Sequence, residues 1–293
     1  MKISNFNITV IISVLVSVLI LGLQKPITDS ILKKQLTEED KYHATYSIKN
    51  AYILPEILNE ISGITSLGNG RFACVQDEDG IIFIYNINDN EIEYKVKFGK
   101  PGDYEAIAIN ESDAYVMHSE GVIFEIKDYE SENPEISEIE TPFKVKNNIE
   151  SLTFDPNNNR LLTIAKNIDL DDKSFKNIYE IPLDTKIMNL EPIAKINLND
   201  IKFKSYKQKS IEKTFNPSDI AIHPKTKDIY IIEGKNPKLL ILTKNGELSK
   251  VLPLDKKKFE QPEGITFSDD SRLFISNEAN SSNANILEVI IKE

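Results

Sequence analysis

Hydrophobic and polar positions alternate after residue 45, in short runs separated by turn residues. The clearest succession predicts strands over about 62–67, 71–76, 81–85 and 91–98. Asn69-Gly70 and the segment Asp77-Glu78-Asp79-Gly80 supply the first two turns. Aromatic and β-branched residues fill the runs, as half-buried strands require. We therefore expect an all-β domain over residues 45–293.

One sequence motif occurs five times along this domain: a small or acidic residue, a small residue, then alternating apolar positions. Its copies are Ser62-Gly63-Ile64-Thr65, Glu105-Ala106-Ile107-Ala108, Glu150-Ser151-Leu152-Thr153, Ser218-Asp219-Ile220-Ala221 and Glu263-Gly264-Ile265-Thr266. The spacings of 43, 45, 68 and 45 residues are, with one exception, near the length of a four-stranded propeller blade. The pattern predicts a β-propeller of about five blades, or six if residues 190–216 contain a degenerate blade.

The longest interval carries a lysine-rich stretch, Lys202 to Lys213. We interpret it as an inserted, solvated loop, with contact to anionic lipid or polysaccharide as the alternative. The last repeat offers three strands and no fourth. The segment 45–54 is expected to complete that blade by pairing with the strand near 284–292, because a closed ring leaves no exposed sheet edge.

The N-terminal part has a different character. Ile8 to Leu23 is an uncharged run of sixteen residues, preceded by Lys2 and ended by Lys25-Pro26. Such a run after a positive residue is typical of a signal anchor or a secretory signal peptide. We expect a hydrophobic helix that serves as an uncleaved signal anchor over 1–24 and a tether over 25–44. Cleavage with secretion, or a buried helix of the folded domain, are the alternatives. The first two interpretations place the domain outside the cytoplasm, on the periplasmic or cell-surface side.

Charge and cysteine content narrow the classes of partner. The formal net charge is −11, so nucleic acid is not an expected partner. The single cysteine, Cys74, excludes an intramolecular disulfide and is expected to be buried and inert. Three histidines without a second His or Cys at ligand spacing argue against a zinc site. We expect a monomer.

The candidate site residues lie where the first strand of each blade starts and the second strand ends. Because the two strands are antiparallel, these ends meet at one mouth of the channel. First-strand starts supply Glu105, Glu150 and Glu263, with Glu60 and Asp103 just before repeat positions. Second-strand ends supply Asp77, Glu78, Glu120, Glu233 and Glu278. Oxygen ligands of this number suit Ca²⁺, or Mg²⁺ with retained waters. The predicted metal ligands are Glu105, Glu150, Glu263, Glu78, Glu233 and Glu278, with Glu60, Asp77 and Asp103 as weaker candidates. The alternative is that these acids form hydrogen bonds to strand backbone or face channel water.

The order and spacing of six segments resemble the SdiA-regulated family of bacterial propellers. The segments are Glu60-Ile61-Ser62-Gly63-Ile64, Val75-Gln76-Asp77-Glu78, Gly102-Asp103-Tyr104-Glu105-Ala106-Ile107, Pro217-Ser218-Asp219-Ile220, Gln261-Pro262-Glu263-Gly264-Ile265 and Ile275-Ser276-Asn277-Glu278. The resemblance covers roughly 55–293 and implies a propeller, an export signal and a calcium-type site in the channel, but no defined activity. One departure is Lys166-Asn167, where the family tends to carry an acidic residue.

Three functional classes are left open. The favoured one is a membrane-anchored module that binds a small molecule or an envelope protein, with a calcium site at the channel mouth. A metal-dependent hydrolase, of phosphoesterase, phytase or lactonase type, would use the same acids to activate water. No His stands at a first-strand start to act as its base, and His118 and His223 are expected to be ordinary surface or turn residues. An interaction module without a small ligand is the third class.

Overall fold

The computed structural model describes residues 42 and 44–292 and divides them into two compact units. The first unit contributes described residues only within 42–47 and at 292, and the second is Ile48–Ile291. The predicted signal anchor (1–24) lies outside the described residues, as does the tether (25–44) apart from Tyr42 and Ala44. Within the part of the chain that the structure describes, no helix is long and apolar enough to cross a membrane.

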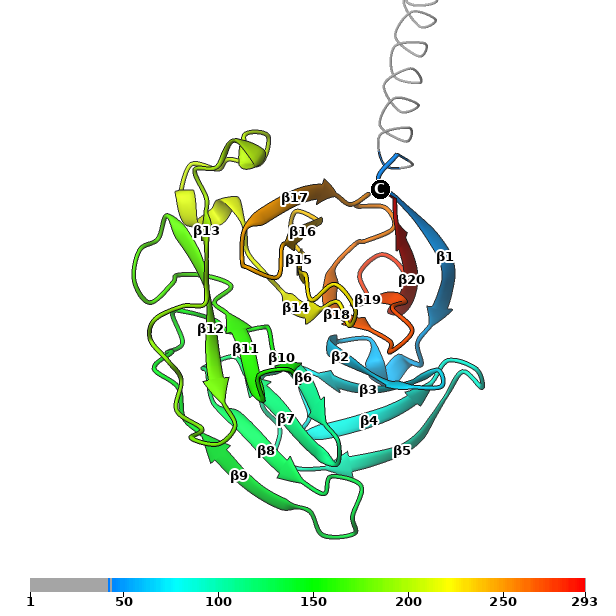
Figure 1. Ribbon diagram of the computed structural model, residues 1–293. Helices are drawn as coiled ribbons and strands as arrows, with labels where there is room; N and C mark the ends of the chain where they lie inside the picture. The colour runs from blue at the N-terminus through cyan, green and yellow to red at the C-terminus, as the bar shows by residue number, and fades with distance from the viewer. Residues whose placement is uncertain (1–41, 43, 293) are drawn as a thin grey trace, which may run out of the picture. The chain divides into compact units, whose positions relative to one another are not determined.

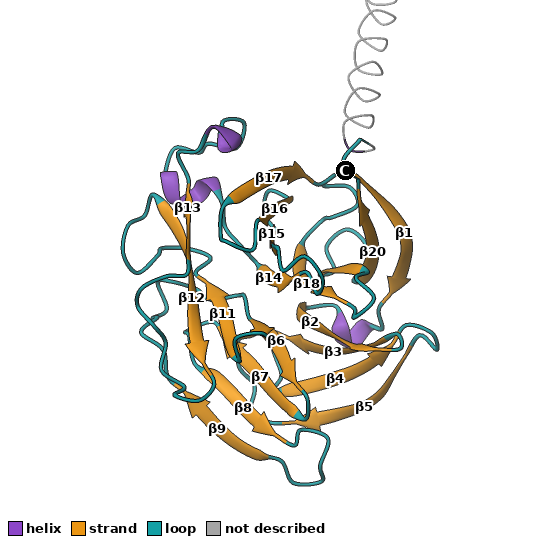
Figure 2. Cartoon of the chain, in the orientation of Figure 1, coloured by secondary structure: helices purple, strands orange, loops and turns teal. Residues whose placement is uncertain are grey.

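In the described residues, twenty strands form five four-stranded sheets, arranged as the blades of a propeller (Figures 1 and 2). Blade 1 contains β2 (Ile61–Gly68), β3 (Arg71–Gln76), β4 (Ile81–Asn86) and β5 (Glu91–Lys97). Blade 2 contains β6 (Tyr104–Asn110), β7 (Asp113–His118), β8 (Ile123–Lys127) and β9 (Glu135–Ile139). Blade 3 contains β10 (Thr153–Asp155), β11 (Arg160–Ile164), β12 (Phe175–Pro182) and β13 (Ala194–Asn197). Blade 4 contains β14 (Asp219–Ile222), β15 (Ile229–Glu233), β16 (Lys238–Leu242) and β17 (Leu248–Pro253). Blade 5 contains β18 (Pro262–Phe267), β19 (Leu273–Asn277), β20 (Asn285–Ile291) and β1 (Tyr46–Ile53).

Blade 5 is completed by the strand from the other end of the chain, as the sequence predicts. Its strand order is β1-β20-β19-β18, so β1 lies against β20. Lys49 Nζ and Asn50 Nδ2 donate to the Glu288 carboxylate at 3.0 and 2.6 Å. Farther along, Leu54 N donates to Ala284 O at 2.9 Å. The predicted pairing of 45–54 with the last strand is therefore confirmed.

The alternative of a sixth blade in 190–216 is wrong. That segment holds β13, the fourth strand of blade 3, and two 3-10 helices, η2 (Ile201–Phe203) and η3 (Ile211–Thr214). The insertion is also more than a solvated loop, because Phe203 within it and Phe215 just after it are fully buried in the core between blades 3 and 4. A third 3-10 helix, η1 (Glu56–Leu58), connects β1 to β2.

The repeated motif lies where the first strands of adjacent blades approach each other closely. The strands β2, β6, β10, β14 and β18 contact one another in a closed ring. Ser62 Oγ donates to Tyr104 O at 2.6 Å, and Ser218 Oγ donates to Pro262 O at 2.9 Å, each bond crossing to the next blade. A Cβ at Gly63 would lie 2.7 Å from Ala106 Cα, so the approach of blade 1 to blade 2 requires glycine at this position.

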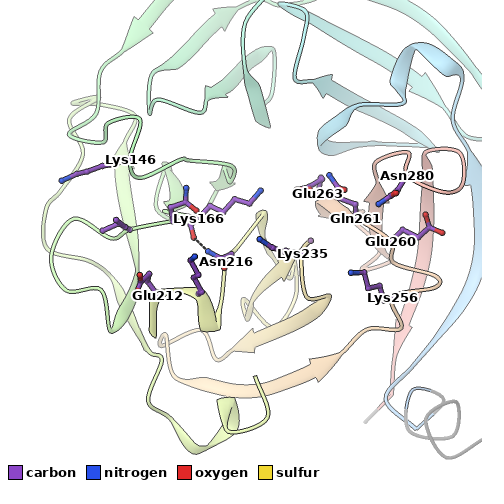
Figure 3. Close-up of a pocket in the computed structure, with 14 residues that line it drawn as sticks. Lys146, Lys166, Glu212, Asn216, Lys235, Lys256, Glu260, Gln261, Glu263 and Asn280 are labelled. Atoms are coloured by element: carbon purple, nitrogen blue, oxygen red, sulfur yellow. Dashed lines mark hydrogen bonds between the residues drawn. The ribbon is translucent and has the colours of Figure 1, made fainter. Parts of the chain in front are cut away.

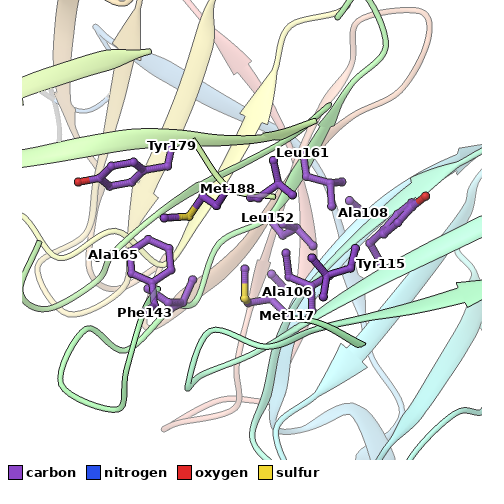
Figure 4. Close-up of a cluster of buried hydrophobic side chains, with 14 residues drawn as sticks. Ala106, Ala108, Tyr115, Met117, Phe143, Leu152, Leu161, Ala165, Tyr179 and Met188 are labelled. Atoms are coloured by element: carbon purple, nitrogen blue, oxygen red, sulfur yellow. The ribbon is translucent and has the colours of Figure 1, made fainter. Parts of the chain in front are cut away.

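Side chains from adjacent sheets interlock to form the hydrophobic core, which is divided into separate clusters between the blades. The cluster between blades 2 and 3 includes Met117, Phe143, Leu152 and Tyr179 (Figure 4). Cys74 lies in the cluster that joins blades 5 and 1, is fully buried, and has a pKa raised by burial. These contacts hold the five blades in a rigid ring and so fix the loops at its two ends.

Candidate functional site

The loops before first strands and after second strands meet at one end of the channel. The pairing of Ile61 with Gln76 in blade 1 and of Pro262 with Asn277 in blade 5 brings the ends of these strands side by side. A cavity of about 680 Å³ opens at this end over blades 3, 4 and 5 (Figure 3). Its lining residues are Lys146, Lys166, Asn167, Ile168, Glu212, Lys213, Asn216, Gly234, Lys235, Lys256, Glu260, Gln261, Glu263 and Asn280. We call this end of the channel the mouth.

The structure brings three of the predicted site residues, Glu105, Glu150 and Glu263, into mutual electrostatic contact at the mouth. Burial raises the pKa of Glu105 to about 10, and the charge of Glu150 adds to the effect. Burial likewise raises the pKa of Glu263. The Glu263 carboxylate packs closely against Gly234, because a Cβ added at Gly234 would lie 2.9 Å from Glu263 Oε1. Three carboxyl groups from three blades thus share a poorly solvated space.

Lys166 supplies a positive charge to this group. Its ammonium forms an ion pair with Glu150, whose side chain is only 6% exposed and also accepts from Asn148 Nδ2 at 2.6 Å. Burial raises the pKa of Glu150, the charge of Lys166 opposes that rise, and the resulting pKa is about 7. Burial alone would lower the pKa of Lys166, but the charges of Glu263, Glu150 and Glu105 raise it above its ordinary value. Figure 3 shows the Lys166 side chain extending toward the side of the cavity that carries Glu263.

A second buried lysine fixes the backbone from which Lys166 extends. Lys176, on β12, donates to three successive carbonyl oxygens: Ala165 O at 3.3 Å, Lys166 O at 2.7 Å, and Asn167 O. Burial lowers the pKa of Lys176 to about 8. Asn216 Nδ2 donates to Lys166 O at 2.9 Å from the neighbouring blade. Sequence analysis missed Lys176, although a lysine within the strand Phe175–Pro182 is a detectable signal of a buried polar contact.

Glu233 does not join the mouth cluster. It is fully buried at the end of β15 and forms an ion pair with Lys238, which is also fully buried. The Lys238 ammonium lies 5.0 Å from the ring centroid of Tyr206 and 5.9 Å from that of Phe215. Asn236 Nδ2 donates to Glu233 Oε1 at 3.3 Å. The structure therefore places Glu233 in an internal ion pair of blade 4, because its strand partner in register is a lysine.

A second acidic group involves blades 1, 2 and 5. Burial raises the pKa of Asp77, and the charges of Glu60 and Asp103 raise it further. Burial, followed by a hydrogen bond with Glu60, raises the pKa of Glu278 to about 8. Asp77 Oδ1 is a buried oxygen without a hydrogen-bond partner in the structure. Of the remaining predicted acids, Glu78 and Glu120 are exposed.

The acids as they stand are not arranged around one point. Among the described residues, no group of three His, Cys, Asp or Glu side chains is placed to hold a metal ion. His118 packs edge-on against Tyr104, with 5.6 Å between ring centroids. His223 follows β14 at the opposite end of the channel and packs edge-on against Phe267 at 4.9 Å.

The fold and the mouth together define a five-bladed β-propeller with a polar, charged cavity at one end of its channel. The SdiA-regulated family model matches residues 194–289, in agreement with the resemblance carried by the sequence motifs of blades 4 and 5. No curated protein matches the chain in sequence.

Solved structures share the fold at low sequence identity. Glutaminyl cyclase from Myxococcus xanthus is 11% identical with a TM-score of 0.55, covering 84% of this chain and 96% of that one. The PQQ-bound form of aldose sugar dehydrogenase from Streptomyces coelicolor is 11% identical with a TM-score of 0.51, covering 84% of this chain and 98% of that one. Similarity at this level supports the propeller fold alone.

Proposed function

We propose that this protein is a ligand-binding module whose site is the cavity at the mouth. The observation that supports the proposal is the cavity itself, about 680 Å³ and lined by loops from blades 3, 4 and 5. Small-molecule sites usually fall between about 300 and 1,000 Å³ and are concave, preformed and few per protein. The rigid ring beneath the loops supplies the preformed geometry.

The second part of the proposal is a divalent cation, Ca²⁺ above all, on the acidic side of the mouth. Asp77, Glu60, Asp103 and Glu278 are the residues that would hold it. Asp77 Oδ1 lacks a hydrogen-bond partner, and burial, together with the charges of Glu60 and Asp103, raises the pKa of Asp77. A cation would supply a partner for the oxygen and offset the repulsion between the carboxylates. Carboxylate oxygens are the donors that Ca²⁺ prefers, and these side chains would have to close around the ion.

The third part concerns location. The apolar run Ile8 to Leu23 supports a membrane anchor that places the propeller outside the cytoplasm. Fractionation of the native protein, followed by protease treatment from the outside, tests this proposal. A membrane-bound chain whose residues 45–293 are open to external protease is the expected result, and a soluble cytoplasmic pool would contradict it.

Thermal unfolding of the full-length chain, kept in a mild non-ionic detergent, tests ligand binding. A panel of anionic, cationic and neutral small molecules should contain compounds that raise Tm. Ile168→Trp fills the cavity from a side chain that is 43% exposed, and should abolish that rise. Ile187→Trp, at a side chain 70% exposed outside the cavity, is the matched control. The proposal fails if no compound raises Tm, or if Ile168→Trp leaves every response intact.

Calcium addition and chelation in the same assay test the cation. Calcium should raise the Tm of the parent, and Asp77→Asn with Glu278→Gln should remove the response. Asp89→Asn with Glu91→Gln, at two exposed positions, should retain it. Equal calcium responses in both double variants would place the ion elsewhere. Calcium-dependent turnover of model esters by the parent would favour the hydrolase class over a binding module.

A further inference from the structure

The lining of the mouth cavity has a charge opposite to that of the protein. The chain carries a formal net charge of −11, yet five of the fourteen lining residues are lysines and three are glutamates. The lysines come from five separate connections between strands around blades 3, 4 and 5: Lys146, Lys166, Lys213 (in η3), Lys235 and Lys256. A concave site with an excess of one sign of charge focuses the field and attracts the opposite sign.

Four of these lysines form no ion pair within the part of the chain that the structure describes. Among the described residues, no carboxylate oxygen lies within 4.0 Å of the ammonium groups of Lys146, Lys213, Lys235 or Lys256. All four are exposed at the rim of the cavity.

Two of the glutamates in the lining already have partners. Glu260 accepts from Ser281 N at 2.9 Å and from Ser281 Oγ at 2.6 Å. Glu263 interacts with the charge of Lys166, which opposes the rise of its pKa caused by burial. The third, Glu212, has a pKa lowered by hydrogen bonds with its own backbone and with Ser210 and by the charges of Lys173 and Lys213. The acids of the lining thus interact within the protein, while the ammonium groups of the rim lysines form no ion pair among the described residues.

Neutral donors complete the lining. Asn167, Gln261 and Asn280 carry amide groups that can donate to ligand oxygens, and Ile168 adds a partly exposed apolar surface. Lysines act as flexible point charges and bind carboxylate or phosphate oxygens without the fixed two-pronged geometry of arginine. A volume of about 680 Å³ suits a small molecule and excludes a polymer from the interior.

We propose that the ligand of the mouth cavity is a small organic anion with two or more negative charges, a polycarboxylate or a phosphate ester, bound by the rim lysines Lys146, Lys213, Lys235 and Lys256. This inference rests on the proposed binding function and specifies the chemical class of its ligand. The two sources of charge, carboxylate and phosphate, share the same requirement for several ammonium groups around one cavity.

Isothermal titration of the full-length chain with tricarballylate and with glycerol 2-phosphate tests the proposal and separates the two sources. At least one of them should bind, and affinity should fall as salt is added. Acetate at equal ionic strength should bind far more weakly, and sorbitol should not bind. Lys235→Ala with Lys256→Ala should weaken binding by roughly tenfold or more.

The matched control lies in the same loop as Lys256. Lys257→Ala with Lys258→Ala removes the same charge at two exposed positions that do not line the cavity, and should change affinity less than about threefold. Equal losses in the two double variants would overturn the proposal, since net charge alone would then explain binding. Absence of binding by both polyanions also overturns it. If neutral or cationic compounds then still raise Tm and Ile168→Trp still blocks them, the proposed function survives without this ligand class.

Discussion

Removing the ammonium at the mouth is the sharpest test of the electrostatics of this protein. Lys166→Met keeps most of the side-chain volume and deletes the charge that faces Glu105, Glu150 and Glu263. The Lys166 side chain is 23% exposed and that of its partner Glu150 is 6% exposed, so the pair is largely shielded from water. Breaking such a pair leaves an uncompensated buried charge, which typically costs about 3–5 kcal/mol.

The cost depends on pH in a defined direction. A carboxyl group whose pKa is higher in the folded than in the unfolded chain holds more protons when folded. The free energy of unfolding therefore falls as pH rises from an unfolded pKa of about 4.3 toward the folded pKa, which is about 7 for Glu150 and about 10 for Glu105. Without Lys166 these pKa values rise further. The loss of stability is expected to be small near about pH 5 and to approach the full 3–5 kcal/mol near about pH 9.

Urea unfolding of the full-length parent and variant at about pH 5, 7 and 9 measures this difference. Lys195→Met is the control, because Lys195 pairs at 3.7 Å with Glu191, which is 89% exposed, and its loss should cost less than about 1 kcal/mol. A divalent cation should restore part of the stability of Lys166→Met by replacing the lost charge. A Lys166→Met protein as stable as the parent near pH 9, or one destabilised equally at all three pH values, would refute the electrostatic account.

Three further predictions follow from single contacts. Gly63→Ala should lower the free energy of unfolding by about 1–3 kcal/mol, because its Cβ would overlap the next blade; unchanged urea unfolding would show that the first strands are less closely packed. Burial opposes the shift, but hydrogen bonds from Asn50 and Lys49 lower the pKa of Glu288 in the folded protein. The stability that Glu288 contributes is therefore present above its unfolded pKa and is lost as pH falls through its folded pKa. Glu288→Gln should therefore cost about 1–3 kcal/mol near neutral pH and less near about pH 3, and a cost independent of pH would contradict the ion-pair assignment. Cys74, fully buried with a raised pKa, should react with thiol reagents only after unfolding, and fast labelling of the native protein would argue against its placement.

Local signals were sufficient to predict most of the fold. Asn69 and Gly70 both have positive φ, 53° and 81°, which is the conformation that an Asn-Gly hairpin turn requires. The closing strand was predictable because the last blade lacked a fourth strand. The shortness of β10 was not predictable: the repeat predicts a strand that starts near Glu150, but only Thr153–Asp155 pair as a strand. A side-chain hydroxyl explains the difference: Ser151 Oγ donates to Ile164 O at 2.9 Å and accepts from Ile164 N at 3.0 Å, so a side chain replaces the backbone ladder bonds to β11 at this point.

The candidate site was predictable only as far as strand direction determines it. Shared starts of first strands placed Glu105, Glu150 and Glu263 at one mouth, and Lys166 was visible as a basic residue in an acidic setting. The ion pair between Glu233 and Lys238 was not predictable, because it depends on the register of β15 against β16. The anchoring of the 165–167 loop by Lys176 is likewise a contact between a side chain and backbone carbonyls, which residue pattern alone does not encode.

The closure of blade 5 has a consequence for the order of events during synthesis. Lys49 and Glu288, which bond across β1 and β20, are 239 positions apart, so one partner emerges from the ribosome long before the other exists. Blades 1 to 4 are each built from consecutive segments and have local partners as soon as they are translated. The strand β1 must therefore wait for β20 to be translated, and contacts of such long sequence separation form slowly. Emergence of β20 from the ribosome is therefore the step that allows the ring to close.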